Sequence, residues 1–376
     1  MGIRYVTNHD DAAEVTRALE GVDSIALDCE AAGFHRYSDR LCLIQLTTPS
    51  ATFLLDTLAF DPAEILAPVL TPTGREVVMH GADFDVRLLD RDLGLRIRGL
   101  FDTQIAASLL GVSSPGLSNL LKKFLGVELS KKYQRADWAE RPLPEEMLRY
   151  AADDTHHLHE LRGILAERLQ EAGRTDWAEE EFRLQEEIRF EDNTPADPVL
   201  RVRAARDLST RDVALLRTAL EWRDATAQKL DRAPFRVAGD DVLLRVVEAR
   251  PRSVDELSEI RGFSGSVAGR EGADLVRRIG EIARAPEEDL LPYPPTPSNG
   301  RGERPSPEEE DRMRRLKGVR NRAAGELGIE KGVLLPNHLL QEIAARAPGD
   351  RSSLLDVPGV RKWQVEVLGR TLLAEV

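Results

Sequence analysis

Short apolar runs separated by polar turns dominate the first 60 residues of the chain. The segments SIALDCE at residues 24–30, LCLIQLTT at 41–48 and ATFLLDT at 51–57 each have the length of a strand. Because they follow one another with only turns between them, we expect them to pair as an antiparallel meander.

Helical spacing then begins to alternate with strands. EVVMH at residues 76–80 is a short predicted strand. FDVRLLDRDLG at 84–94 has helical spacing and ends at a glycine, and FDTQIAASLLG at 101–111 repeats that pattern. The fold class that follows is α/β, with a mixed sheet flanked by helices.

The rest of the chain is helical and is interrupted by two breaks, DNTPADP at residues 192–198 and a Pro-, Gly- and Ser-rich stretch at 285–307. At 376 residues the chain is long enough for two or three domains. We expect an α/β domain at 1–170, a helical connector at 171–208, small all-α domains at 209–285 and 308–376, and a Pro-rich linker at 286–307.

The two helical units share a pattern. Each has an arginine-rich first helix, a middle helix, a short apolar helix and a glycine turn, IRGF at residues 260–263 and VPGV at 357–360. This similarity predicts a weak internal repeat of about 70 to 80 residues.

Composition indicates where the protein works. No apolar run approaches the roughly 18 residues of a membrane helix, and the first residues lack the apolar core of a signal peptide. Val6 stands where a myristoylation signal has Ser or Thr. Two cysteines, Cys29 and Cys42, cannot form a disulfide scaffold in a chain of this length, so we expect a cytoplasmic protein without a membrane partner.

Several acids stand where strands end or helices begin. Asp28 and Glu30 are two apart at the end of a strand, so both side chains point to one face, with Cys29 on the other. Asp85 follows the next strand, with Asp83 as a competing candidate. Taken singly, solvent exposure of a strand end or the preference of helix starts for acids explains each of them at least as well as function does.

Tyr150 and Asp154 are four apart in YAADD, which we interpret as the start of a helix, and they share a face. A solvated acid beside a half-buried tyrosine would explain this pair alone. The order of the whole set is more specific: D-x-E, an acid about 55 residues on, and Y-x3-D some 65 residues further.

With this set, the chain resembles the tyrosine-containing branch of the DEDD superfamily of 3′→5′ exonucleases, and within it the ribonuclease D family. The phrases that carry the resemblance are LDCEAAGFHRYSDRLCLIQLT, VVMHGADFDVRLL, FDTQIAASLLG and ADWAERPLPEEMLRYAADDTHHL. The histidine branch would need His where Arg149 stands. The two helical units are similar to HRDC (helicase and RNase D C-terminal) modules.

The resemblance implies an RNase H-like sheet domain and a site in which Asp28, Glu30, Asp85 and Asp154 hold two divalent ions, Mg²⁺ or Mn²⁺, about 4 Å apart. It further implies that Asp28 bridges both ions, that Glu30 and Asp154 hold the first, and that Asp85 supports the second through water. We expect Tyr150 to orient the attacking water, because a phenol with a reference pKa near 10 is a poor base.

The function that the resemblance implies is metal-dependent hydrolysis of single-stranded RNA from its 3′ end, releasing nucleoside 5′-monophosphates during 3′ maturation of tRNA precursors or other small RNA. A DNA-directed exonuclease and a non-catalytic nucleic-acid-binding scaffold are the alternatives. The net charge of −13 argues mildly against nucleic-acid binding, although a carboxylate-rich site contributes to that total.

Other conspicuous side chains are expected to be structural. Asp102 lies outside the core ligand set, and the HHxH spacing of His156, His157 and His159 does not converge on one zinc ion. Trp138, Trp222 and Trp363 are expected to be packing residues. The arginines of the helical units either contact phosphates or pair with neighbouring acids such as Glu221 and Asp224, and the sequence leaves both open: Arg217, Arg223, Arg232, Arg245, Arg314, Arg315, Arg320 and Arg322.

Overall fold

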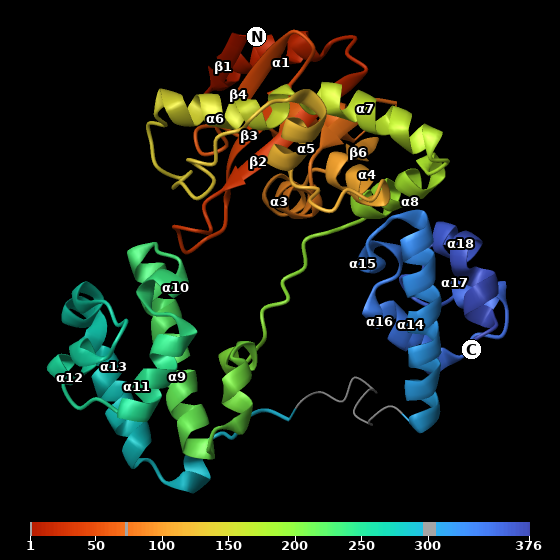
Figure 1. Ribbon diagram of the computed structural model, residues 1–376. Helices are drawn as coiled ribbons and strands as arrows, with labels where there is room; N and C mark the ends of the chain where they lie inside the picture. The colour runs from red at the N-terminus through yellow and green to blue at the C-terminus, as the bar shows by residue number, and fades with distance from the viewer. Residues whose placement is uncertain (1, 72–73, 296–305) are drawn as a thin grey trace.

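A mixed six-stranded sheet forms the N-terminal domain of the computed structural model, which describes residues 2–71, 74–295 and 306–376 (Figure 1). The sheet order is β1-β4-β3-β2-β5-β6. The strands are β1 (Gly2–Val6), β2 (Ser24–Ala31), β3 (Leu41–Thr47), β4 (Ala51–Leu55), β5 (Glu76–Met79) and β6 (Leu100–Asp102). The pairs β2–β3 and β3–β4 are antiparallel, which confirms the predicted meander, and the β1–β4, β2–β5 and β5–β6 pairs are parallel.

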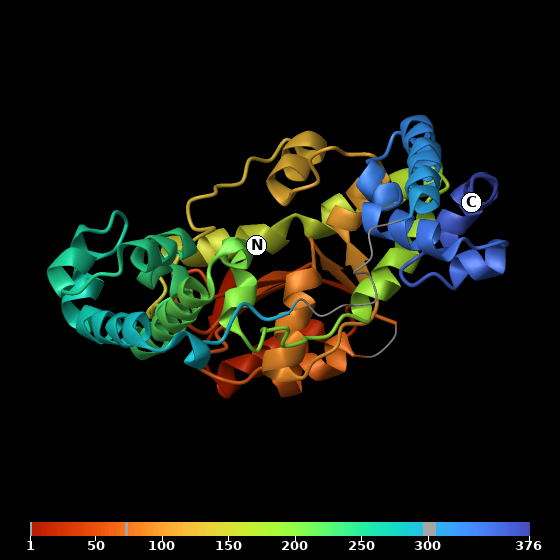
Figure 2. The same cartoon turned by 90° about the horizontal axis from the view of Figure 1, so that it is seen from below.

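Helices cover both faces of this sheet. They are α1 (His9–Leu19), α2 (Ala63–Leu70), α3 (Asp83–Leu93), α4 (Thr103–Leu109), α5 (Leu117–Leu125), α6 (Glu145–His156) and α7 (Leu158–Glu171). In Figure 2, α6 and α7 lie on one side of the strands and the helices of the first 95 residues lie on the other. β3 is buried along its whole length, which explains why LCLIQLT reads as a continuous apolar run.

Two sequence predictions are wrong in detail. Residues 101–111 do not form one helix, because the segment begins in β6, which pairs with β5. Asp102 then caps α4 by accepting hydrogen bonds from the backbone N–H groups of Gln104 and Ile105. The YAADD segment does not start a helix either: α6 begins at Glu145, directly after Pro144, so Tyr150 lies in its middle.

The connector and the two C-terminal modules are helical. The connector contains α8 (Thr175–Glu186) and the 3₁₀ turns η1 (Pro198–Arg201) and η2 (Arg203–Asp207). The first helical module contains α9 (Thr210–Leu230), α10 (Pro234–Val237), α11 (Asp240–Ala249), α12 (Val254–Glu259) and α13 (Gly265–Arg284), followed by η3 (Glu287–Asp289). The second helical module contains α14 (Pro307–Leu327), α15 (Lys331–Leu334), α16 (Asn337–Arg346), α17 (Arg351–Leu355) and α18 (Lys362–Leu373).

The two modules repeat one arrangement of helices. Their lengths are 21, 4, 10, 6 and 20 residues in α9–α13, and 21, 4, 10, 5 and 12 residues in α14–α18. The glycine turns singled out in the sequence have the same conformation, with φ of 89° at Gly262 and 90° at Gly359. Of the predicted linker at 286–307, residues 296–305 lie outside the described part of the chain.

The modules attach to the N-terminal domain in different ways (Figure 1). The second module packs on α8: Trp177 and Trp363 stack with centroids 4.7 Å apart, and the buried apolar side chains of the module belong to the same core as those of the sheet. The first module has a core of its own. It meets the loop at 32–40 through polar contacts, among them Tyr37 Oη donating to Asp224 Oδ2 at 2.9 Å, and through the rings of Tyr37 and Phe34. None of the described helices is both long and apolar enough to cross a bilayer.

Candidate active site

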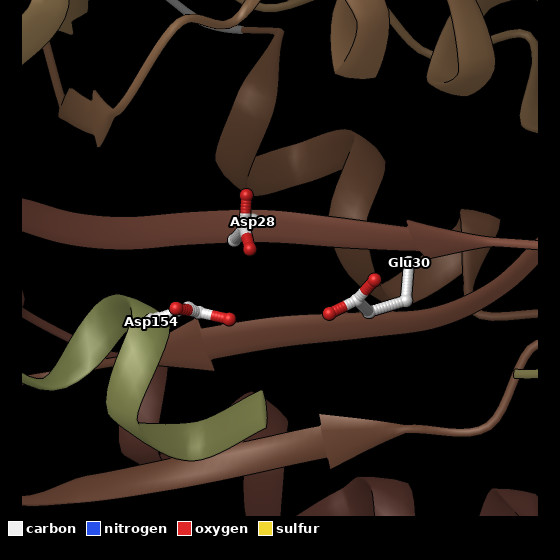
Figure 3. Close-up of side chains that lie close together, drawn as sticks. All are labelled: Asp28, Glu30 and Asp154. Carbon is white, nitrogen blue, oxygen red and sulfur yellow. The ribbon is translucent and has the colours of Figure 1, made fainter. Parts of the chain in front are cut away.

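Three carboxylates from two elements lie together at the surface of the sheet (Figure 3). Asp28 and Glu30 lie on β2, and Asp154 lies near the end of α6. One carboxylate oxygen of each lies within 4.8 Å of the others. The sequence placed these residues in separate segments, and the fold brings all three to one point.

The position of α6 across the sheet determines this convergence. Thr155, the residue after Asp154, is fully buried, and its hydroxyl lies 2.7 Å from that of Thr47 on β3, a hydrogen bond between helix and sheet. Asp28 is paired with Gln45 of β3 in the antiparallel ladder, so β2 and β3 form one platform below the helix. This contact directs the Asp154 side of α6 toward β2.

Asp85 lies deeper than the other three acids. It is buried, at 6% exposure, and it does not belong to the cluster of carboxylates within 4.8 Å among the described residues. Its charge nevertheless contributes to the raised pKa of both Asp28 and Glu30. Asp83, the competing candidate, is largely exposed and forms a 3.2 Å ion pair with Arg87. The geometry therefore favours Asp85 over Asp83 as the acid that stands between D-x-E and Y-x3-D in the sequence pattern.

Asp102 supports the loop before α3. Its buried carboxylate accepts hydrogen bonds from the backbone N–H groups of Gly81 at 3.0 Å and Ala82 at 2.8 Å. The same carboxylate accepts from Gln104 and Ile105 at the start of α4. Asp102 thus fixes the segment from which α3 carries Asp85, which is a structural role.

Burial and repulsion between neighbouring carboxylates raise the pKa values of the four acids and favour their protonated forms. Burial, with the nearby charge of Asp85, raises the pKa of Asp28 well above its usual range. Burial and the charges of Asp28 and Asp154 do the same to the pKa of Glu30. Burial, followed by Asp28 and Asp153, raises the pKa of Asp154 to about 8, and burial with Asp102 and Asp83 raises the pKa of Asp85 to about 8.

This donor set fits a hard divalent cation. All the ligand atoms on offer are carboxylate oxygens, which suit Mg²⁺ or Mn²⁺ better than a metal that prefers sulfur or imidazole. A cation would replace the protons that the raised pKa values retain, and would relieve the repulsion between the acids. The cluster is therefore a candidate metal site on its own chemistry.

Tyr150 lies one turn before Asp154 on α6. Its ring packs against Tyr133 and Trp138, with centroids 5.9 and 6.1 Å away. Burial, followed by the charges of Asp154, Glu30 and Asp28, raises the pKa of the phenol. The side chain therefore stays protonated near neutral pH and offers an O–H donor rather than a base.

The acids open into a cavity of about 410 Å³. Asp28, Glu30, Tyr150 and Asp154 line it together with polar side chains that the sequence analysis did not single out: His80, Gln104, Ser118, Asn119, Ser130, Lys131 and Gln134. The KKYQR run at residues 131–135 was a usable signal, because it is a basic cluster in an acidic chain.

His80 lies in a short chain of hydrogen bonds with Thr103 and Met79. Its Nδ1 lies 2.9 Å from the hydroxyl of Thr103, which itself donates to the carbonyl oxygen of Met79 at 3.0 Å. Because that hydroxyl has only one proton, both contacts are satisfied when the ring donates from Nδ1, the tautomer that leaves Nε2 as an acceptor. Burial lowers the pKa of His80, which maintains the neutral ring.

Gln45 is another residue that the sequence analysis missed. Its side chain is fully buried opposite Asp28 in the β2–β3 ladder. Neither the amide nitrogen nor the amide oxygen has a hydrogen-bond partner within the described part of the chain. A donor and an acceptor without partners among the described residues therefore lie on the residue opposite Asp28, although most buried polar groups in proteins are hydrogen-bonded.

The residues expected to be structural are packed or dispersed. Trp138, Trp222 and Trp363 are each 2% exposed. His156 ends α6 and His157 lies between α6 and α7, and none of the three histidines joins a metal-ligand cluster in the described residues.

Most of the candidate arginines in the helical modules pair with residues of the same chain. Arg217, Arg223 and Arg245 pair with aspartates, and Arg314 and Arg315 share Asp311. Arg320 is buried, 2.7 Å from Asn337 Oδ1. Arg232 and Arg322 have no ion pair among the described residues.

Comparison with known proteins agrees with this geometry. Residues 3–170 match a protein family described as 3′-5′ exonuclease, and residues 212–279 and 309–376 each match the HRDC domain. The second match confirms the internal repeat. A solved structure, RNase D of Escherichia coli, superimposes with a TM-score of 0.69 at 25% identity, covering 100% of this chain and 98% of that one.

Curated relatives extend the similarity along the chain. Ribonuclease D of Granulibacter bethesdensis is 29% identical over 98% of this chain and 91% of its own length. Exosome complex component 10 of Rattus norvegicus is 32% identical, but this chain spans only 29% of that protein. Ribonuclease D of Gluconacetobacter diazotrophicus is 31% identical over 80% of this chain and 77% of its own length. With an exonuclease domain, two HRDC modules and this extent of similarity, the chain belongs to the ribonuclease D family of 3′→5′ exonucleases.

Proposed function

We propose that this protein removes nucleotides one at a time from the 3′ end of single-stranded RNA and releases nucleoside 5′-monophosphates. The observation that carries the proposal is the group formed by Asp28, Glu30 and Asp154, which lines one cavity together with Tyr150. A cavity of about 410 Å³ with one group of carboxylates has room for a single terminal phosphodiester.

Metal binding is the first requirement of this chemistry. Asp28, Glu30 and Asp154 would hold Mg²⁺ or Mn²⁺, and Asp85, which lies deeper, would support a second ion once it has lost its proton. The bound metal supplies Lewis acidity to the phosphoryl oxygens and lowers the pKa of a coordinated water. The acids themselves lose their retained protons on binding, because each raised pKa reflects a charge that lacks a counter-ion.

Tyr150 contributes orientation. Its protonated hydroxyl lies on the same face of α6 as Asp154 and lines the cavity, so it can hold the attacking water by a hydrogen bond. Lys131, in the same lining, offers a positive charge to the phosphate that is being cleaved. Together they align the water and stabilise the negative charge that develops in the transition state.

RNA is the proposed substrate because the relatives that match over most of this chain are named ribonuclease D. The Escherichia coli structure is described as an exoribonuclease involved in structured RNA processing. By this similarity we propose the 3′ ends of tRNA precursors and other small structured RNA as natural substrates, in the cytoplasm.

The test uses purified protein and two end-labelled single strands of equal sequence, one RNA and one DNA. Each is incubated with Mg²⁺, Mn²⁺ or EDTA, alongside Asp28→Ala. Asp153→Ala serves as a matched control, because Asp153 is the exposed acid beside Asp154. The expected result is metal-dependent shortening of RNA from its 3′ end, lost in Asp28→Ala and kept in Asp153→Ala.

Other results would change the assignment. Preferential shortening of DNA would keep the site and replace the substrate. Metal-dependent hydrolysis by Asp28→Ala would contradict the site, and no release from either strand would leave a nucleic-acid-binding scaffold as the function.

A further inference from the structure

Two phenylalanine rings from different domains meet on the surface where the first helical module joins the N-terminal domain. Phe34 lies in the loop at 32–40 that follows β2, and Phe235 lies on α10, which sits beneath the N-terminal domain in Figure 1. Their centroids are 5.5 Å apart. Phe34 is 39% exposed and Phe235 is 52% exposed, so packing between the domains does not account for the area they present to solvent.

Arginines flank these rings. The guanidinium carbon of Arg236 lies 4.9 Å from the centroid of Phe34 and 5.9 Å from that of Phe235. Arg135 approaches Phe34 to 5.6 Å from another loop. Next to them, Arg232 and Arg236 line a cavity of about 580 Å³. Within the described residues Arg135 and Arg232 make no ion pair, in contrast to most arginines of the helical modules.

Partly exposed aromatic rings beside arginines that make no ion pair among the described residues suit one class of ligand. Bases of a single strand stack on aromatic rings, and arginines bind the phosphates between them. We propose that Phe34, Phe235, Arg135, Arg232 and Arg236 form an aromatic platform that binds single-stranded RNA upstream of the nucleotide being removed. This assignment rests on the proposed function, and it adds a binding site outside the catalytic cavity.

The chain connects the aromatic platform directly to the catalytic cavity. Lys131 and Gln134 line that cavity, and Arg135, the next residue, lies over Phe34. On the other side, Glu30 is only four residues before Phe34. A strand whose 3′ end is held at the carboxylates therefore has a short route to the aromatic platform.

Docking of the module does not depend on the rings alone. Tyr37 Oη donates to Asp224, Arg36 pairs with Asp231 at 3.3 Å, and the backbone N–H of Ala233 donates to the carbonyl oxygen of His35 at 3.1 Å. A ring can therefore be exchanged for another apolar side chain while these contacts remain. This separates RNA binding from domain attachment.

The experiment measures binding in EDTA, where no turnover is expected. A fluorescein-labelled RNA of twelve nucleotides is titrated by anisotropy with the full-length protein and with Phe235→Leu, Phe235→Tyr and Arg135→Gln. Phe235→Leu keeps an apolar contact but removes the aromatic face, and Phe235→Tyr restores it. We expect Phe235→Leu and Arg135→Gln each to weaken binding about tenfold and Phe235→Tyr to bind as the parent does.

Matched controls carry the same changes elsewhere. Phe190→Leu alters an exposed ring that also lies near an arginine, 5.2 Å from Arg91, and Arg183→Gln alters an exposed arginine on α8. Tyr37→Phe removes an interdomain hydrogen bond without touching the rings. All three should bind within about twofold of the parent, and small-angle scattering should show the module docked in every variant.

Hydrolysis of a dinucleotide in Mg²⁺ separates this proposal from the catalytic one. If Phe235→Leu binds the twelve-nucleotide RNA as tightly as the parent does, the aromatic platform does not bind RNA. Intact hydrolysis of the dinucleotide would then still support the catalytic proposal. If the parent hydrolyses neither substrate but Phe235→Leu loses affinity, the platform stands and the proposed activity fails. Equal loss of affinity in Tyr37→Phe and Phe235→Leu would assign the effect to docking and overturn the proposal.

Discussion

The carboxylate of Asp102 accepts a hydrogen bond from the backbone N–H of Ala82 at 2.8 Å, and so ties the end of β6 to the residue that precedes α3. With its further bonds to Gly81, Gln104 and Ile105, this one buried side chain satisfies the N–H groups of two helix starts. The site therefore depends on an acid that we do not expect to touch metal or substrate.

Replacement of Asp102 by alanine should destabilise the protein strongly. Each charge-assisted hydrogen bond contributes about 1.5–3 kcal/mol, so the loss should reach at least about 3 kcal/mol. Urea unfolding in EDTA measures it. Asp61→Ala is the control, since Asp61 accepts one bond at the exposed start of α2, and its loss should cost about 1 kcal/mol or less. Similar midpoints for both variants would contradict the structural role.

A comparison of Asp83 and Asp85 on α3 can show which of them serves the metal site. Asp85→Asn removes a buried carboxyl group that becomes a metal-supporting carboxylate when it loses its proton, so we expect turnover to fall by about a hundredfold or more. Asp83→Asn removes an exposed partner of Arg87 and should keep turnover within about twofold. Mononucleotide release under saturating Mg²⁺ distinguishes them, and the reverse order of effects would exchange their roles.

Tyr150→Phe should separate turnover from metal binding. The variant retains the ring that packs on Tyr133 and Trp138 but loses the hydroxyl, so we expect kcat to fall about tenfold to a hundredfold. Mg²⁺ affinity, measured by isothermal titration calorimetry, should stay unchanged. Tyr133→Phe, whose hydroxyl bonds to Glu146 instead, is the control. Full activity of Tyr150→Phe would show that the hydroxyl does not orient the water.

Metal affinity should rise with pH. Asp85 and Asp154, with pKa values raised to about 8, must lose protons before they can bind a cation. Between pH 6.5 and 8 each released proton should strengthen Mg²⁺ binding by about tenfold per pH unit. Calorimetry in two buffers of different ionisation enthalpy would count these protons, and an affinity independent of pH would contradict the assignment.

The same shifts predict how the metal-free protein responds to pH. Because the folded-state pKa values lie above the reference value of 3.8, the folded protein binds more protons than the unfolded chain between about pH 4 and 8. Their contribution is fully present below pH 4 and is lost as pH rises through 8. In EDTA these groups should therefore lower the melting temperature as the pH rises from 5 to 8. Mg²⁺ should remove this decrease.

Some of the site follows from sequence alone and some does not. Strand alternation is enough to place Asp28 and Glu30 on one face, and helical spacing is enough to align Tyr150 with Asp154. The meeting of the two pairs depends on a long-range contact, the bond between Thr47 and Thr155, which no local pattern contains.

Some of the elements that the sequence analysis missed have weak local signals, whereas α1, α2 and α5 carry clear helical patterns that it did not use. β1 is an edge strand with an exposed first half, so it lacks an apolar run. α10 and α15 have four residues each, too short to show periodicity. The lining of the cavity by Lys131 and Gln134 comes from an irregular loop without periodicity, where the basic KKYQR run at residues 131–135 is the available signal.

The two modules, alike in their helices, differ in how their apolar cores are connected. The second module shares one continuous core with the sheet through Trp177 and Trp363, and the first has a separate core and polar contacts. Parts of a protein that share one packed core tend to unfold together. The protein should therefore melt as two units, of which one joins the N-terminal domain to the second module and the other is the first module. Residues at both ends of the chain would unfold together, and the module between them would unfold independently.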